Sequence, residues 1–297
     1  MNVLVAGGSG FVGTALVAAL RADRHRVRVL TRRRDEAGPD APFWNPPAGE
    51  IDRAAFAGAD AVVNLSGATI ATRWSPEKKR EIRESRVRCT RLLAETMAAL
   101  PERPSVFVSA SATGFYGDRG DELLTEAATP AGDFLAQVCV AWEDAAAPAR
   151  AAGIRVVHPR LGLVLSPAGG VLKQMLPPFR AGLGGPLGTG RQWWSWVVLH
   201  DVVAALRFAL VTPTIGGPVN VVAPGAVRNA DFAKTLGAVL GRPAAVPVPT
   251  IALRLLFGEA AEGAILAGAR IAPTALAAAG FPFAHPDLEP ALRHLLT

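Results

Sequence analysis

The sequence predicts an α/β protein, with a doubly wound parallel Rossmann sheet and a small, mostly helical C-terminal lobe. Short apolar runs alternate with longer helical patterns through the first two-thirds of the chain, which is the order of consecutive βαβ units. A glycine-rich turn joins the first apolar run to the first helix, as dinucleotide-binding folds require. After about residue 165 the pattern changes to Ala-rich helical segments broken by prolines.

This change in pattern divides the chain into two parts. We expect residues 1–165 to form an NADP-binding Rossmann domain, completed by a returning segment at about 197–225. We expect residues 166–297 to form a C-terminal lobe that covers the substrate. The chain is long enough to bury a large core.

Composition excludes several classes of function. The net charge is +6, but the basic residues are scattered, and their densest run, 78–91, is interleaved with glutamates. That is typical of a solvated helix face and not of a nucleic-acid surface.

Cys89 and Cys139 have no metal-ligand spacing and lie in apolar stretches, which favours buried, reduced thiols. No apolar run approaches the length of about 18 residues that spans a bilayer.

These observations set the expected partners and location. We expect a small-molecule substrate, no metal, no nucleic acid and no membrane partner, with a homodimer left open. The first strand runs directly into the glycine loop, with no basic leader before it, so a cytoplasmic location is predicted.

The first βαβ unit contains the loop GGSGFVG at 7–13, between an apolar strand at 3–6 and a helical pattern. One glycine allows the tight turn, one lets the backbone approach a pyrophosphate, and one lets helix and strand pack closely. The helix N-terminus presents free N–H groups to phosphates. The alternative is a glycine-rich turn without a ligand. The residues expected to contact the cofactor are Gly7, Gly10, Phe11, Val12 and Gly13.

The end of the second strand identifies the dinucleotide. Residues 27–30 are followed by Thr31-Arg32-Arg33-Arg34, where an NAD-binding chain would place Asp or Glu for the ribose hydroxyls. Arginine suits a 2′-phosphate instead. The predicted cofactor is therefore NADP(H), held at this end by Thr31, Arg32 and Arg33.

Later strand ends supply further candidates, because ligands of doubly wound sheets bind at the carboxyl ends of the strands. The strand at 61–65 ends in Leu65-Ser66-Gly67, whose small residues let the backbone pass the adenine or ribose; an ordinary turn is equally compatible. The segment VSASATGFYGD at 108–118 combines strand-end serines with a Tyr-Gly pair. We place Ser109 beside the cofactor.

Six motifs in one order across nearly the whole chain resemble one family. They are GGSGFVG, VVNLSG, SASATGFYG, the Trp142-Glu143 pair, RLGLVL and GLGGPLGTGRQWWSW. The chain is similar to the atypical extended short-chain dehydrogenase/reductases that are called NAD-dependent or sugar-nucleotide epimerase-like and carry a small C-terminal domain of unknown function. The resemblance implies NADP binding through Thr31, Arg32, Leu65, Ser66, Glu81, Arg86 and the backbone near Val164.

The same resemblance assigns Ser111 a role. In extended short-chain dehydrogenases a strand-end serine or threonine hydrogen-bonds the reacting carbonyl or hydroxyl, and Ser111 matches that position. The alternative is a hydroxyl that satisfies backbone groups in a turn.

The chain departs from these enzymes in its proton-transfer residues. They use a tyrosine activated by a lysine four residues later on the same helix face. Counting back from Trp142-Glu143 puts these roles at Leu135 and Cys139, which cannot transfer the proton. Tyr116 is the single tyrosine, and no lysine lies between positions 79 and 173. The usual dyad is therefore absent.

Several other groups are candidates for proton transfer in place of the dyad. Tyr116, with a pKa ordinarily at about 10, would need a cation nearby, for which Arg160 and Arg191 are the candidates. We take Ser111 and Tyr116 as the candidate catalytic residues, and we expect Tyr116 to lie at a strand end facing the nicotinamide region. The alternative is that Tyr116 caps its loop. The other titratable candidates are Asp118, Asp121, Glu143 and the pair His200-Asp201.

The segment 182–196 is rich in glycine and tryptophan. As a lid, it would stack aromatic faces on a flat or sugar-like ligand; alternatively, the tryptophans wedge the C-terminal lobe onto the sheet. We expect Trp196 to be buried, with Arg191 to Trp193 nearer the ligand.

The function predicted from the sequence is an NADP(H)-dependent oxidoreductase or epimerase-like enzyme that transfers hydride to or from a small carbonyl or alcohol. A sugar nucleotide as the substrate is supported by family analogy alone, since the sequence has no second phosphate-binding fingerprint. The alternative is a non-catalytic NADP(H) sensor, which the missing dyad favours.

Overall fold

The computed structural model describes residues 1–296 and confirms the predicted Rossmann architecture. The main sheet has the strand order β13-β9-β6-β5-β1-β2, with β7 (Ser111–Ala112) also paired to β9, and every pairing is parallel. The chain passes from β1 to β2 on one side and then crosses to β5 on the other. Its strands are β1 (Asn2–Ala6), β2 (Arg26–Val29), β5 (Ala61–Asn64), β6 (Val106–Ser109), β9 (Arg155–Leu161) and β13 (Gly217–Val221).

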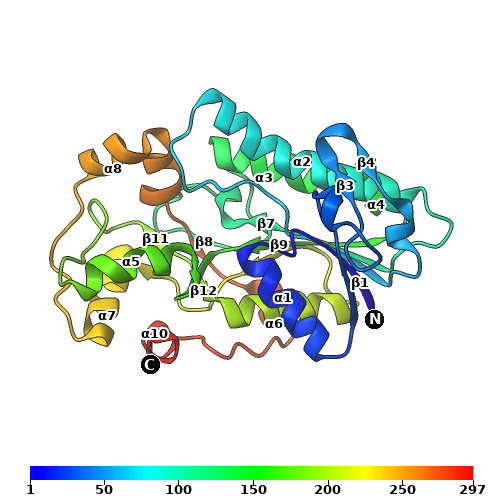
Figure 1. Cartoon of the computed structure of the whole chain (residues 1–297). Coiled ribbons are helices and arrows are strands. Elements are labelled where there is room, and N and C mark those ends of the chain that lie inside the picture. Colours follow the sequence, from blue (N-terminus) through cyan, green and yellow to red (C-terminus); the bar gives the residue numbers. More distant parts are fainter. Residues whose placement is uncertain (297) are drawn as a thin grey trace.

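Helices cover both faces of the sheet (Figure 1). On one face α1 (Phe11–Ala22) packs beside α6 (Leu199–Val211), and on the other lie α2 (Pro76–Ala98), α3 (Phe134–Asp144) and α4 (Ala147–Ala151). Side chains alternate along each strand. Accordingly, Val3 and Val5 are buried with α1 and α6, whereas Leu4 is buried with Leu93 and Met97 of α2.

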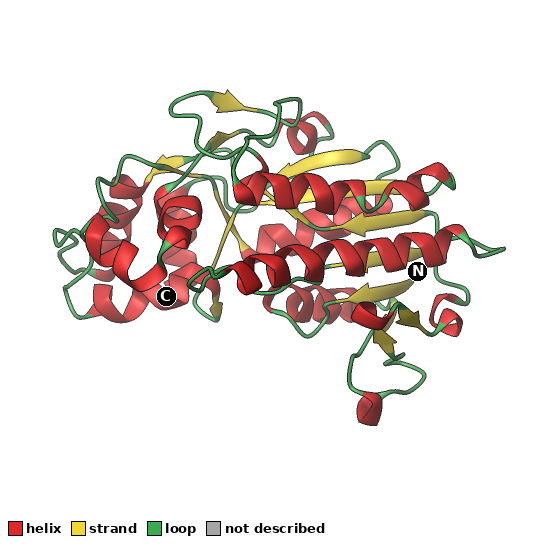
Figure 2. Cartoon of the chain, turned by 90° about the horizontal axis from the view of Figure 1, so that it is seen from above, coloured by secondary structure: helices red, strands yellow, loops and turns green. Residues whose placement is uncertain are grey.

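The C-terminal lobe is mostly helical and lies at one end of the sheet (Figure 2). Its core contains Trp194, Phe232 and Leu292, together with Trp196, which is fully buried as expected. The lobe is not continuous in sequence, because α6 and β13 return to the sheet layer. Its helices are α5 (Gly170–Arg180), α7 (Asn229–Leu240), α8 (Thr250–Phe257), the π-helix η5 (Ala261–Leu266) and α10 (Leu288–Leu296). The short helix α9 (Thr274–Ala278) packs against β13 of the main sheet.

Short two-stranded pairings connect the lobe to the loops that follow the sheet. They join β10 (Leu163–Ser166) to β12 (Trp196–Val198), β11 (Trp193–Trp194) to β14 (Val227–Arg228), and β15 (Arg270–Ile271) to β8 (Leu123–Leu124). A separate hairpin is formed by β3 (Trp44–Asn45) and β4 (Glu50–Ile51). Short 3₁₀ turns are η1 (Arg34–Glu36), η2 (Pro46–Ala48), η3 (Arg53–Phe56) and η4 (Thr113–Phe115).

No helix within residues 1–296 is both long enough and apolar enough to cross a bilayer.

The glycine loop brings α1 very close to the sheet. Gly7 has φ +77°, and a Cβ built on it would lie 2.7 Å from the carbonyl carbon of Leu65. A Cβ on Gly13 would lie 2.1 Å from the carbonyl oxygen of Gly7. Because neither contact can be relieved by a side-chain rotation, only glycine allows this approach of helix and strand.

We expect Gly13→Ala to lower the free energy of unfolding by about 2–3 kcal/mol or more, because the added methyl forces α1 away from β1. Urea unfolding followed by circular dichroism measures this change. Gly38→Ala is the matched control, since a Cβ at Gly38 meets no atom within 4 Å, and it should stay within about 0.5 kcal/mol of the parent. Equal stability of the two variants would contradict the close packing.

Candidate functional site

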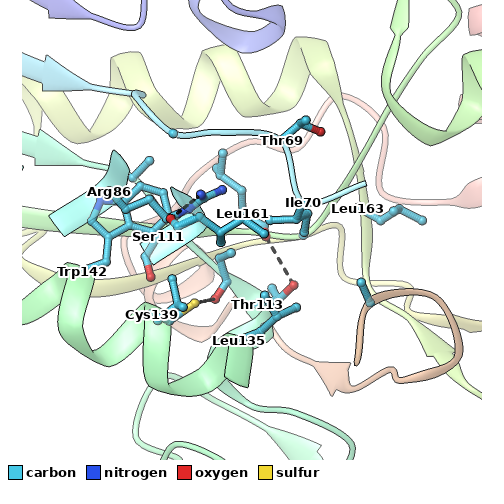
Figure 3. Close-up of a pocket in the computed structure, with 18 of the residues that line it drawn as sticks. Thr69, Ile70, Arg86, Ser111, Thr113, Leu135, Cys139, Trp142, Leu161 and Leu163 are labelled. Carbon is cyan, nitrogen blue, oxygen red and sulfur yellow. Dashed lines mark hydrogen bonds between the residues drawn. The ribbon is translucent and has the colours of Figure 1, made fainter. Parts of the chain in front are cut away.

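A cavity of about 630 Å³ opens at the carboxyl ends of β1, β5 and β6 (Figure 3). Because the chain reverses direction across the sheet between β1 and β5, this is the topological switch point at which such sheets bind ligands. The volume lies within the range of small-molecule sites. The cavity is lined by segments 7–13, 65–70 and 110–117, by the inner face of α3, and by residues 263–271 of the C-terminal lobe.

The glycine loop forms one end of the cavity. All five residues expected to contact a cofactor there line it. Gly10 is the N-cap of α1 and supplies no side-chain cap, so the N–H groups of the first turn remain available to a ligand. This end of the cavity fits a pyrophosphate, because it offers free N–H groups, the positive end of a helix dipole and a space that any Cβ would fill.

Arg86 of α2 lines the cavity beside Gly67. Its Nη1 donates to the carbonyl oxygen of Ile82 (2.9 Å), and its guanidinium carbon lies 5.0 Å from the ring centroid of Trp142. Burial lowers the pKa of Arg86. No carboxylate within residues 1–296 pairs with it, so this partly buried cation suits a ligand that carries a negative charge.

Two buried polar atoms of the cavity lining also lack a partner in the described part of the chain. They are Nε1 of Trp142 and the Oγ of Ser66. Buried donors without acceptors are rare in folded proteins. Together with Arg86, they make this wall of the cavity suited to the oxygen atoms of a ligand.

The arginines after β2 do not line the cavity, and they differ from one another in their ion pairs. Arg33 forms ion pairs with Asp35 (3.0 Å) and Glu36 (2.6 Å). Arg32 is exposed and has no ion pair or hydrogen bond to another residue of 1–296. Thr31 accepts a hydrogen bond from the N–H of Arg33. Of the residues predicted here, Arg32 is therefore the cation left available for a phosphate.

Ser111 lies in the cavity and is bonded to a carboxylate. Its Oγ donates to Oε1 of Glu143 at 2.6 Å. Arg160 grips the same carboxylate in bidentate fashion, with Nε–Oε1 and Nη2–Oε2 distances of 2.9 Å. The exposed fractions of the Arg160 and Glu143 side chains are 4% and 13%, so the pair is largely shielded from water. Ser111 is thereby held between the cavity and a charge-neutralised base.

Tyr116 lies behind the cavity wall. It is fully buried and does not line the cavity. Its hydroxyl donates to Oδ1 of Asn220 (2.6 Å) and accepts from Nη1 of Arg160 (2.9 Å). Burial raises the pKa of Tyr116 although Arg160 opposes the change. The expectation that Tyr116 faces the nicotinamide region is wrong, whereas the neighbouring cation, Arg160, is as predicted.

Leu135 and Cys139 occupy the positions expected for the missing dyad. Both line the cavity from one face of α3, as Figure 3 shows. Burial raises the pKa of Cys139 to about 12, and its thiol donates to the carbonyl oxygen of Ala112 (3.6 Å). Neither side chain can move a proton at neutral pH.

Besides Thr31, Arg32 and Arg33, three further residues predicted to bind the cofactor do not line the cavity. Ser109 is fully buried and lies within 3.5 Å of Asn64 and Thr90, because its side chain turns into the sheet layer. Glu81 is exposed and pairs with Lys78, since it lies on the outer face of α2. Val164 lies in β10, paired with β12.

The other titratable candidates have structural roles. Asp201 is buried and accepts the N–H groups of Ala284 and His285. Asp118 accepts the N–H of Gly120. Within residues 1–296 no cluster of three or more His, Cys, Asp or Glu side chains is arranged to hold a metal ion.

The tryptophan segment meets the cavity through different residues from those expected. Trp194 and Ser195 line it, whereas Arg191 to Trp193 do not. Sequence reasoning also missed the wall formed by residues 263–271, for which the Ala- and Gly-rich composition was the sole signal.

Comparison with known proteins agrees with this geometry. The model of the NAD dependent epimerase/dehydratase family matches residues 3–222. The chain belongs to the NAD-dependent epimerase/dehydratase family. A second family model, a domain of unknown function, matches residues 248–295 of this family member. The resemblance inferred from the six motifs is confirmed.

Several relatives of this epimerase/dehydratase family member match over its whole length. An epimerase family protein of Mycobacterium bovis is 44% identical over 99% of this chain and 97% of its own. The crystal structure of human epimerase family protein SDR39U1 (isoform 2) with NADPH has a TM-score of 0.89 at 34% identity, covering 99% of both chains. A nucleoside-diphosphate sugar epimerase of Corynebacterium glutamicum has a TM-score of 0.82 at 38% identity, covering 100% of this chain and 58% of that one.

Tyrosinate absorbance reports Tyr116 alone, because the sequence has no other tyrosine. Burial raises its pKa, so we expect the native protein to titrate above the ordinary value of about 10, and the urea-unfolded chain at that value. Since the fold stabilises the neutral phenol, the free energy of unfolding should decrease as the pH rises above about 10. A native midpoint below the unfolded one would contradict the buried placement.

Proposed function

We propose that this protein is an NADP(H)-dependent oxidoreductase that transfers hydride between the nicotinamide and a small carbonyl or alcohol. The main support is that one continuous cavity is lined both by the glycine loop and by Ser111. The NADPH in the crystal structure of the human relative supports the choice of cofactor. A cytoplasmic location and a homodimer stay predictions.

The residues that would hold the cofactor follow from the site. The N–H groups at the start of α1 bind the pyrophosphate, and Arg32 binds the 2′-phosphate. Arg86 supplies a second cation within the cavity. When bound, the reduced nicotinamide supplies the hydride.

Ser111 and Glu143 supply the proton chemistry in place of the Tyr-Lys dyad. Ser111 hydrogen-bonds the oxygen of the substrate. During alcohol oxidation its Oγ accepts the hydroxyl proton while its own proton passes to Oε1 of Glu143; carbonyl reduction reverses both transfers. Arg160 neutralises Glu143 and fixes its orientation, so the carboxylate is held at the hydroxyl without being exposed to water.

A non-catalytic NADP(H) sensor is the second candidate, favoured by the apolar Leu135 and the neutral Cys139 at the dyad positions. Single-turnover measurements with stoichiometric NADPH distinguish the two functions. We expect the absorbance of bound NADPH to decay with at least one member of a panel of aldehydes, ketones and quinones. Tight NADPH binding with no oxidation by any of them would support the sensor instead.

Arg32→Ala should weaken NADPH binding by about 10- to 100-fold, because it removes charge-assisted hydrogen bonds to the 2′-phosphate. Binding of NADH, which lacks this phosphate, should change little. Titration of nucleotide fluorescence gives both affinities. Arg33→Ala is the matched control, since Arg33 is already paired with Asp35 and Glu36. Equal losses for NADPH and NADH would refute the role of Arg32.

Ser111→Ala should lower the single-turnover rate by about 100-fold or more, as expected for loss of a positioned proton-transfer group. The affinity for NADPH should remain within about twofold, because Ser111 carries no charge for the phosphates to meet. The control is Ser166→Ala, which removes a buried serine hydroxyl that does not line the cavity. A rate unchanged in Ser111→Ala would remove Ser111 from the mechanism.

A further inference from the structure

The part of the cavity away from the glycine loop carries no free cation. Arg86 and Asp133 are the charged side chains among the described residues that line the cavity. Arg86 stands at the cofactor end, beside Gly67. Asp133 is the N-cap of α3, and its Oδ1 accepts the N–H of Ala136 at 2.9 Å.

Two hydroxyl groups of this part, those of Thr113 and Ser195, donate to backbone carbonyl groups. Thr113 donates to the carbonyl oxygen of Leu161 (3.3 Å), a contact visible in Figure 3. Ser195 donates to the carbonyl oxygen of Ala269 (2.7 Å) and accepts the N–H of Ile271 (3.0 Å). The surrounding wall is formed by Ile70, Leu135, Leu163, Trp194, Ala264 and Ile271.

Two arginines of the C-terminal lobe, Arg228 and Arg270, contact Trp193 and do not line the cavity. Trp194 of β11 lines the cavity, whereas its neighbour Trp193 does not. The guanidinium carbons of Arg228 and Arg270 lie 4.3 Å and 5.0 Å from the ring centroid of Trp193. Arg228 is also ion-paired with Asp121. These cations are therefore packed against Trp193 and are not part of the cavity lining.

We propose that the substrate of this site is an uncharged, largely apolar ketone, aldehyde or alcohol, and not a nucleotide sugar. This inference rests on the proposed hydride-transfer function and narrows its substrate class. A nucleoside diphosphate carries at least two negative charges, and burying them against an apolar wall without a cation is strongly unfavourable. An apolar molecule gains free energy at the same wall.

The size of the cavity supports the same conclusion. The volume of about 630 Å³ includes the glycine-loop end, where a dinucleotide would lie. A nucleotide sugar is itself comparable in size to a large part of a dinucleotide, so both would compete for this space. A single polar group, Ser111, is enough to orient one carbonyl or hydroxyl oxygen among apolar side chains.

Leu135 connects the absence of the dyad with the apolar character of the cavity. It takes the place of the dyad tyrosine and also forms part of the apolar wall. A charge placed there should expel an apolar ligand while leaving the helix intact, because position 135 lies in the first turn of α3, where an acidic side chain is compatible with the helix dipole.

Binding of prodan tests the proposal without requiring turnover. Prodan is an uncharged naphthyl ketone whose emission shifts to shorter wavelength when water is excluded. We expect saturable, micromolar binding to the NADPH-saturated protein and to the protein alone. Leu135→Asp should weaken it at least tenfold. Gln137→Asp, the same charge on the exposed side of α3, should stay within twofold.

Competition separates the two substrate classes. UDP and UDP-glucose at millimolar concentration should not displace prodan; displacement at submillimolar concentration would overturn the proposal. Unchanged prodan binding in Leu135→Asp would also overturn it. Leu135→Phe, which fills the cavity without a charge, provides a second variant that should weaken binding, and NADPH fluorescence verifies that both variants are folded.

The same samples distinguish failure of this proposal from failure of the proposed function. Prodan binding with no NADPH binding would overturn the cofactor assignment and leave the apolar character of the cavity intact. NADPH binding with no prodan binding would overturn the apolar substrate alone.

Discussion

The buried guanidinium of Arg160 is the constraint on which the site depends. It lies near the end of β9 and joins Glu143 of α3 to the hydroxyl of Tyr116, while its guanidinium carbon lies 3.4 Å from the ring centroid of Phe115. A buried cation is tolerated when its hydrogen-bonding groups are all matched, and loss of one partner is strongly destabilising. This requirement fixes α3 against the sheet and so fixes the carboxylate that Ser111 contacts.

The same network extends into the C-terminal lobe. Tyr116 donates to Asn220 of β13, and Nδ2 of Asn220 donates to the carbonyl oxygen of Ala272 (2.9 Å). Glu126 accepts the N–H groups of both Asn220 and Ala275 at 3.0 Å. The segment that closes the cavity is therefore held by the edge of the sheet. Tyr116 has a structural position in this chain of hydrogen bonds, between the cation and the lobe.

One side of α3 combines apolar side chains with a carboxylate. Leu135, Cys139 and Glu143 follow one another at intervals of four, so they lie along one side of α3. The first two turns of this side are apolar, and the third carries the carboxylate that reaches Ser111. This side of α3 therefore presents Leu135 and Cys139 to the cavity and holds the carboxylate of Glu143 at Ser111.

The sequence by itself determined the Rossmann fold, the glycine cradle, the arginines after β2 and the absence of the dyad. These features depend on local spacing and residue type, which the sequence displays directly. Tertiary structure decided that, among residues 1–296, Arg33 has ion-pair partners and Arg32 has none. It also decided that Tyr116 and Ser109 are buried and that residues 263–271 line the cavity. It also joined Ser111 to Glu143, 32 residues away, and Glu143 to Arg160. Such pairings depend on the direction of each side chain at the end of a strand and on the groups that the packed neighbours place beside it. Local sequence periodicity determines neither of these.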